Sequence, residues 1–283
     1  MQPSECKAFE LHIAEDRIVR GDFYEAASQP AMGTLVICHG YKGFKNWGMF
    51  PHVAQSLSKD VNVMAINFSH NGVGEDLLEF TELEKFARDT YSRDLEDLEA
   101  VVEEIRRNEQ LAGAGTGAGE KPILLLGHSR GAGVCLIYAL DHPDQIAGVI
   151  SWNGISNVDL LTEDNKNEMR IAGRSYTLNG RTKQNMPLDL EILEDMESNS
   201  ERFNIMGRIS GAAFPIALIQ GTEDSERLIR GSRQMVEQNS SIQWIRIPEG
   251  NHTFGSVHPY QGESQALKQA IQETLHTIRE MLG

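Results

Sequence analysis

The sequence predicts a doubly wound α/β fold, in which a mostly parallel sheet carries helices on both faces. Short runs of continuously apolar and β-branched residues recur along the chain, at residues 34–38, 61–68, 123–126, 147–152, 214–219 and 242–247. Runs of this length without polar alternation are typical of strands that are buried on both faces, as in parallel sheets. Helical patterns lie between these runs, and such alternation is typical of the α/β class.

Three helices and one hairpin are predicted by the spacing of apolar residues. Apolar residues at four-then-three spacing over residues 91–105 give one apolar stripe on an otherwise charged segment. Residues 132–140 are apolar nearly all round, as expected for a helix that packs directly on a sheet, and a last helix is expected over residues 264–281. Near the start of the chain, alternating apolar residues predict a hairpin that turns at residues 14–16.

One segment, residues 155–212, interrupts the alternation of strands and helices. It shows no convincing strand pattern, and it is rich in Asn, Glu, Asp and Arg with scattered methionines and leucines. We therefore expect an α/β core formed by residues 1–154 and 213–283, with a helical cap or lid inserted between two strands of the sheet as residues 155–212.

Composition and charge narrow the classes of function. The chain has 283 residues and a net charge of −15, and an acidic surface repels both phosphate backbones and anionic membranes. We therefore expect neither a nucleic-acid partner nor a membrane partner, and no apolar run approaches the roughly 20 residues that span a bilayer. The first residues show no basic segment followed by an apolar one, so we expect no secretory signal and a cytoplasmic protein. Cys38 and Cys135 lie in apolar runs and are expected to be buried.

The clearest chemical motif is Gly127-His128-Ser129-Arg130-Gly131, which directly follows the apolar run at 123–126 and precedes the predicted helix at 132–140. A strand, a tight turn and a helix in this order form an elbow that lifts the serine hydroxyl clear of the sheet. Small residues two before and two after the serine are needed because the strand and the helix approach closely. The motif therefore predicts Ser129 as a nucleophile.

A serine hydroxyl needs a base to accept its proton, and in this architecture the base is a histidine late in the chain. His252 lies after the last predicted strand and before the last predicted helix, where the fold needs the base. We predict His252 as the base, with His258 as the second candidate.

The base in turn needs a carboxylate that orients the imidazole and stabilises its protonated form. Asp224 follows the predicted strand at 214–219, so it lies at the carboxyl edge of the sheet, where sites occur in open α/β folds. We predict Asp224 as the acid. Its neighbour Glu223 is expected to point elsewhere, and Asp159 is the other candidate.

An oxyanion needs two backbone N–H donors. We expect one from Arg130, directly after Ser129 at the start of a helix. The other is expected from Tyr41, in the His-Gly-Tyr-Lys-Gly loop that follows the strand at 34–38. His39 opens this loop and is expected to support the turn instead of acting as a base.

These motifs together resemble the α/β-hydrolase superfamily along almost the whole chain. The resemblance rests on the loop at 39–43, the Asn-Phe-Ser-His-Asn-Gly turn at 67–72, the elbow, Gly-Thr-Glu-Asp at 221–224 and Gly-Asn-His at 250–252. Within the superfamily the chain is similar to bacterial cinnamoyl/feruloyl-esterase-like and dienelactone-hydrolase-like proteins. This resemblance implies hydrolysis of carboxylic esters with no metal or organic cofactor. Dienelactone hydrolases use a cysteine nucleophile, so the serine of this chain argues against their substrate.

The leading hypothesis is therefore a Ser-His-Asp esterase that acts on a small-molecule ester through an acyl-enzyme. Peptide or thioester cleavage by the same triad is the alternative, followed by a non-catalytic binding protein with this fold. No spacing of His, Cys and carboxylates indicates a zinc site. The glycine-rich stretch at 112–119 is expected to be a surface loop, because it follows a helix and precedes a strand, the reverse of a dinucleotide-binding motif. The sequence does not indicate an oligomeric state.

Overall fold

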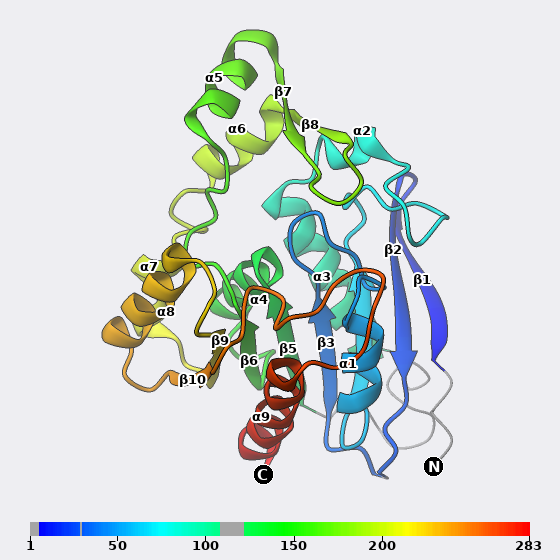
Figure 1. Ribbon diagram of the computed structural model, residues 1–283, viewed down its shortest axis with the longest axis vertical. Helices are drawn as coiled ribbons and strands as arrows, with labels where there is room; N and C mark the ends of the chain where they lie inside the picture. The colour runs from blue at the N-terminus through cyan, green and yellow to red at the C-terminus, as the bar shows by residue number, and fades with distance from the viewer. Residues whose placement is uncertain (1–5, 29, 108–121) are drawn as a thin grey trace.

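The computed structural model describes residues 6–28, 30–107 and 122–283. Among these residues, eight strands form one sheet in the order β1-β2-β4-β3-β5-β6-β9-β10 (Figure 1). The strands are β1 (Lys7–Ala14), β2 (Arg17–Tyr24), β3 (Thr34–Cys38), β4 (Asn62–Asn67), β5 (Ile123–His128), β6 (Gly148–Trp152), β9 (Ile216–Gly221) and β10 (Gln243–Ile247). Strands β1 and β2 run antiparallel to their neighbours, and every neighbouring pair from β4 to β10 is parallel. The predicted fold class and the N-terminal hairpin are confirmed.

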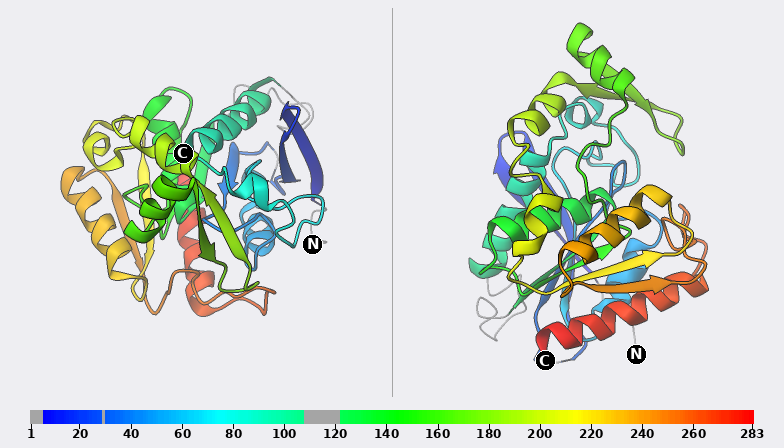
Figure 2. Two further views of the ribbon diagram at one scale, coloured as in Figure 1. Left: turned by 90° about the horizontal axis from the view of Figure 1, so that it is seen from above. Right: turned by 90° about the vertical axis from the view of Figure 1, so that its left-hand side faces the viewer.

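Helices cover both faces of the sheet and enclose one apolar layer on each. On one face α1 (Phe50–Leu57) and α9 (Gln265–Leu282) pack together, and their buried residues share one hydrophobic cluster. On the other face α3 (Tyr91–Arg107), α4 (Arg130–Asp141) and α8 (Glu226–Gln238) contribute to a second cluster. Figure 2 shows β9 and β10 lying between α8 and α9. Every residue of β3, β4, β5, β6 and β9 is buried, which explains why these strands appear in the sequence as mostly apolar runs without polar alternation.

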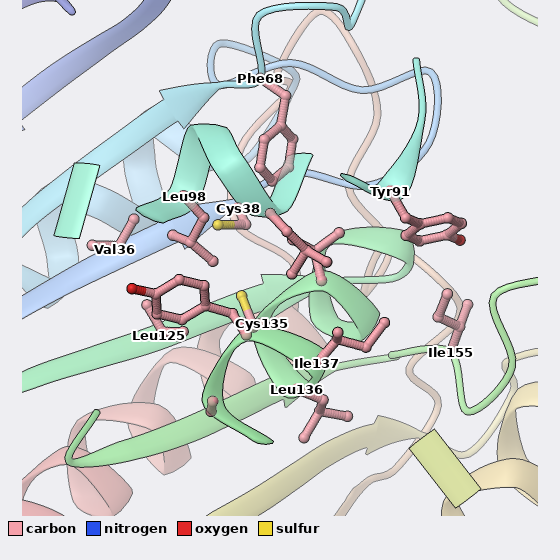
Figure 3. Packing of buried hydrophobic residues seen from close by; sticks show 14 of the residues in the cluster. Val36, Cys38, Phe68, Tyr91, Leu98, Leu125, Cys135, Leu136, Ile137 and Ile155 are labelled. Atoms are coloured by element: carbon pink, nitrogen blue, oxygen red, sulfur yellow. The ribbon is translucent and has the colours of Figure 1, made fainter. Parts of the chain in front are cut away.

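The cluster beneath α3 and α4 holds both cysteines of the apolar runs. Cys38 at the end of β3 and Cys135 in α4 are fully buried, as expected, and lie among Leu98, Leu125 and other aliphatic side chains (Figure 3).

The segment between β6 and β9 contains helices and one hairpin. Its elements are α5 (Glu163–Ala172), β7 (Arg174–Leu178), β8 (Asn185–Asp189), α6 (Leu190–Ser198), α7 (Ile205–Arg208) and a 3-10 turn at Ile209–Gly211. β7 and β8 pair only with each other, so the expectation that this segment has no strand is wrong. The strands escaped the sequence analysis because they are short and largely polar, and Tyr176 and Leu178 of β7 are more than half exposed.

This segment lies above the carboxyl edge of the sheet (Figure 1). There β8 contacts α2 (Leu83–Phe86), and the Asp189 N–H donates to the Ala87 carbonyl. The predicted loop at 112–119 lies outside the described residues. None of the helices in the described parts of the chain is long and apolar enough to cross a membrane.

Candidate active site

Ser129 occupies the turn between β5, which ends at His128, and α4, which begins at Arg130. Its backbone has φ 55° and ψ −118°, a left-handed conformation that is rare for a residue with a side chain. The motif glycines make this turn possible. A Cβ on Gly127 would lie 2.3 Å from Ala132 Cα, and one on Gly131 would lie 2.3 Å from the His39 carbonyl oxygen. The strand–turn–helix that the motif predicts is therefore present.

The adjacent strand end holds the strained backbone of Ser129 in place. The Ser129 N–H donates to the Trp152 carbonyl at 2.9 Å, and the Ile155 N–H donates to the Ser129 carbonyl at 3.2 Å. Trp152 is the last residue of β6, the next strand of the sheet. Both the N–H and the carbonyl of Ser129 are therefore hydrogen-bonded to the chain at the end of this strand.

Ser129, His252 and Asp224 lie in one hydrogen-bonded chain, although 123 residues separate the first two. The distance from Ser129 Oγ to His252 Nε2 is 3.1 Å. His252 Nδ1 lies 3.1 Å from Asp224 Oδ1 and 3.2 Å from Oδ2. The arrangement has the connectivity that lets an imidazole accept the serine proton while a carboxylate orients the ring.

The carboxylate of Asp224 is itself held by two donors. Its Oδ2 accepts from Gln220 Nε2 at 2.9 Å, and its Oδ1 accepts from the Ser225 N–H at 2.7 Å. The Asp224 side chain is 2% exposed, whereas the His252 side chain is 41% exposed. The acid is therefore buried and fixed, and the base faces the open side of the site.

The alternative acid and base candidates are not part of this hydrogen-bonded chain. Glu223 is exposed. Asp159 forms an ion pair with Lys166 at 2.6 Å. His258 Nδ1 accepts from the Gly48 N–H at 2.9 Å, and its ring stacks on Trp47.

His39 supports the loop after β3, as expected. Its Nε2 accepts from the Phe68 N–H at 3.3 Å, and its Nδ1 lies 2.9 Å from the Gly40 carbonyl, to which it donates. Burial lowers the pKa of His39 to about 4, so the ring is neutral near pH 7.

The two residues predicted to supply the oxyanion donors belong to segments that adjoin Ser129. The Arg130 N–H belongs to the first turn of α4, where N–H groups have no partner within the helix. The loop that carries Tyr41 packs against the nucleophile, since a Cβ on Gly40 would lie 3.0 Å from Ser129 Cβ. Tyr41 and Arg130 also line the same small cavity.

The side chain of Arg130 forms a buried charged cluster that the sequence analysis missed. Its guanidinium contacts Asp89 at 2.5 Å and Asp94 at 2.9 Å, and it lies 4.5 Å from the centre of the Tyr91 ring. Burial raises the pKa of both aspartates, while the positive charge of Arg130 acts in the opposite direction. A basic residue inside an apolar helix is the signal in the sequence that indicates such a partner.

One cavity opens at Ser129, and a second lies beside the next residue, Arg130. An open groove of about 500 Å³ is lined by Ser129, His252, Leu228 and other residues of the acid and base loops. A narrow cavity of about 30 Å³ lies between Tyr41 and Arg130 on one side and apolar residues of the 155–212 segment on the other, namely Leu160, Leu161, Leu188, Ile192 and Met196. Leu160 lines both cavities. Within the described ranges, no group of three or more His, Cys, Asp or Glu side chains is placed to hold a metal ion.

Comparison with known proteins agrees with this architecture. Residues 33–171 match a family model described as alpha/beta hydrolase fold. No curated protein matches the chain in sequence. The matched range contains the loop of Tyr41, the elbow of Ser129 and the start of the 155–212 segment.

Solved structures extend the likeness to the full length. The chain is similar to Est1E from Butyrivibrio proteoclasticus with ferulic acid bound, with a TM-score of 0.74 and 15% identity over 97% of this chain and 99% of that one. It is also similar to a soluble variant of monoglyceride lipase from Saccharomyces cerevisiae, with a TM-score of 0.71 and 13% identity over 99% of this chain and 97% of that one. A third similar structure is dienelactone hydrolase from Anabaena variabilis, with a TM-score of 0.64 and 14% identity over 99% of each chain. Together with the sheet order and the turn at Ser129, these matches identify the chain as a protein of the α/β-hydrolase fold.

Proposed function

We propose that the protein is a serine hydrolase that cleaves carboxylic esters through an acyl-enzyme. The observation that carries the proposal is the chain of contacts from Ser129 Oγ through His252 to Asp224, at 3.1 Å for each step. Nucleophile, base and orienting acid then stand in the order that activates a serine. The fold is one that hosts esterases and lipases among the solved structures similar to this chain.

In the first half of the reaction Ser129 Oγ forms a bond with the ester carbonyl carbon while His252 Nε2 takes the hydroxyl proton. The carbonyl oxygen gains negative charge and accepts hydrogen bonds from the N–H groups of Tyr41 and Arg130. The bond between the carbonyl carbon and the alcohol oxygen then breaks, and His252 gives its proton to the leaving alcohol. Water repeats these steps on the acyl-enzyme and releases the acid and free Ser129.

The two cavities suggest where the halves of the ester bind. His252 must reach the leaving oxygen, so the alcohol lies on the side of Ser129 where the open groove is lined by His252 and Leu228. The acyl group then lies on the side of Tyr41 and Arg130, where residues of the 155–212 segment enclose the narrow cavity. We propose this segment as the cap and its apolar surface as the acyl site. Its volume of about 30 Å³ suits only a small acyl group.

The proposal is tested with p-nitrophenyl esters whose acyl groups range from acetyl to aromatic. Each ester is assayed with the wild type and with Ser129→Ala. We expect turnover to fall by about 10⁶ in the variant, as when a triad member is removed. Full activity of Ser129→Ala would show the proposal to be wrong. Faster cleavage of matched aminoacyl anilides or thioesters than of the oxygen esters would assign the triad to a peptidase or a thioesterase instead.

A further inference from the structure

We propose that Asn153 and His128 are positioning residues. They hold the backbone of His252, the base, next to the end of β9, which leads to Asp224, the acid. This inference rests on the proposed function, because it concerns how that triad is kept in register. Asn153 follows β6, and β6 lies in the sheet between β5, which leads to Ser129, and β9, which leads to Asp224.

The amide of Asn153 is fully buried and uses its whole hydrogen-bonding capacity. Its Oδ1 accepts from Gln220 Nε2 and from the Gly221 N–H, each at 2.8 Å. Its Nδ2 donates to the His252 carbonyl at 2.9 Å and to the Asn251 carbonyl at 3.2 Å. One side chain therefore joins the end of the acid strand to the backbone of the base.

The contact on the acid side extends to the carboxylate itself. Gln220 Nε2 donates both to Asn153 Oδ1 and to Asp224 Oδ2, the latter at 2.9 Å. Because a carboxylate only accepts, the NH₂ end of the Gln220 amide faces Asp224, and its Oε1 accepts from the hydroxyl of the buried Ser232 at 2.8 Å. The acceptor oxygen of Asn153 thus helps to keep Asp224 in place.

On the base side a second donor shares the same acceptor. His128 Nε2 lies 2.8 Å from the His252 carbonyl oxygen, and since a carbonyl only accepts, His128 carries its proton on Nε2. The rings of His128 and His252 lie 4.9 Å apart, centre to centre. Burial and the nearby His252 lower the pKa of His128 to about 3, so this donor stays neutral beside the base.

The geometry implies an effect on turnover and little effect on substrate binding. Neither Asn153 nor His128 lines the groove at Ser129 or the narrow cavity beside Arg130. Both act on the backbone of the residue whose ring must stay within hydrogen-bonding distance of Ser129 Oγ. Small displacements of a catalytic group lower rates strongly, by about 100-fold for a misplacement of 1 Å.

Three substitutions separate the effect of the hydrogen-bond donors from the effect of side-chain shape. Asn153→Asp keeps the acceptor towards Gln220 and Gly221 but replaces both N–H donors with an oxygen that faces two carbonyls. Asparagine and aspartate both tolerate the left-handed backbone at this position, where φ is 48°. His128→Leu removes the other donor and keeps an apolar side chain, whereas His128→Gln retains an N–H donor in place of Nε2.

The experiment measures kcat and KM for a p-nitrophenyl ester, and the rate at which a fluorophosphonate labels Ser129, in these three variants. We expect Asn153→Asp to lower kcat by about 100-fold and His128→Leu by about 10-fold, with KM within about twofold of the wild type. Labelling should slow in parallel, and His128→Gln should recover most of the rate. Melting curves show whether each variant is folded, and the two histidine variants suffice if Asn153→Asp does not fold.

The matched control is Asn239→Asp, which removes an amide donor to the Ile209 carbonyl far from the site. It should keep the wild-type kcat. The positioning role is overturned if Asn153→Asp and His128→Leu keep the wild-type kcat, if only KM changes, or if His128→Gln is as slow as His128→Leu. If the wild type is active and Ser129→Ala is inactive, any of these outcomes would overturn only the positioning role and leave the proposed function intact. Absence of both ester hydrolysis and labelling in the wild type would overturn the proposed function and this inference with it.

Discussion

The guanidinium of Arg130, the residue directly after Ser129, donates to Asp89 Oδ2 at 2.5 Å inside the protein. This ion pair connects the elbow to the segment that precedes α3, and Asp94 adds a second carboxylate at 2.9 Å. The backbone N–H of Arg130 is a proposed oxyanion donor. The ion pair therefore holds the side chain of the same residue whose backbone faces the site. The cluster therefore couples the stability of the fold to the position of the site.

Arg130→Met should destabilise the protein by about 3–5 kcal/mol at pH 7, because it leaves two buried aspartates without their cation. Burial raises the pKa of Asp89 and Asp94 and the charge of Arg130 lowers it, so without Arg130 both carboxyls take up protons at a higher pH in the folded state than they do in the wild type. The loss of free energy of unfolding in Arg130→Met, relative to the wild type, should therefore be smaller at pH 5 than at pH 7. Urea unfolding of variant and wild type at both pH values measures it.

The exposed pair Arg279–Asp60 serves as the control for this measurement, since the Arg279 side chain is 56% exposed. Arg279→Met should change the free energy of unfolding by no more than about 1 kcal/mol. Equal deficits for Arg130→Met at pH 5 and pH 7 would contradict the role of the two aspartates.

The free energy of unfolding should fall as the pH drops from 7 to 5, in part because of buried histidines. The pKa of His39 is about 4 and that of His128 about 3 in the folded state, against about 6.5 in an unfolded chain. Below pH 6.5 the unfolded state takes up protons that the folded state does not, so each group contributes a loss of about 2 kcal/mol by pH 5. Urea unfolding of His39→Gln over this range should give a shallower slope, and an unchanged slope would contradict the assignment.

Ser129→Gly should be more stable than Ser129→Ala, by about 1 kcal/mol. Glycine adopts the positive φ at position 129 without the strain that a Cβ causes there. Both variants should lack esterase activity, so the comparison isolates the strain in the turn. Calorimetry should show a melting temperature about 2 °C higher for the glycine variant. A lower one would mean that position 129 is not strained.

Ile192→Ala should shift acyl preference towards larger groups. Ile192 of α6 lines the narrow cavity beside Tyr41, and it is nearly buried. Removing three carbons should raise the ratio of kcat/KM for hexanoyl over acetyl esters by about 10-fold. Leu228→Ala, on the groove side of Ser129, should alter preference for the alcohol and leave the acyl ratio unchanged. The reverse pattern would exchange the two binding sites.

Much of the fold follows from local patterns. The strands β3, β4, β5, β6 and β9 are buried along their whole length, so each appears as a mostly apolar run that can be recognised without knowledge of its neighbours. Ser129 is recognisable for a similar reason, because Gly127 and Gly131 mark the close approach of strand and helix within five residues. The positions of Asp224 and His252 follow from their places after successive strands.

Other features depend on which chain segments meet in space. The hairpin β7–β8 is stabilised by its own pairing and by contacts with α2, so its residues carry no apolar run. Arg130 meets an aspartate 41 residues earlier, and Asn153 meets His252 99 residues later. Burial leaves a periodic trace in the sequence, whereas a hydrogen bond between distant segments leaves none. The sequence by itself therefore determined the sheet, the elbow of Ser129 and the candidate triad, and only the tertiary structure decided what holds that triad together.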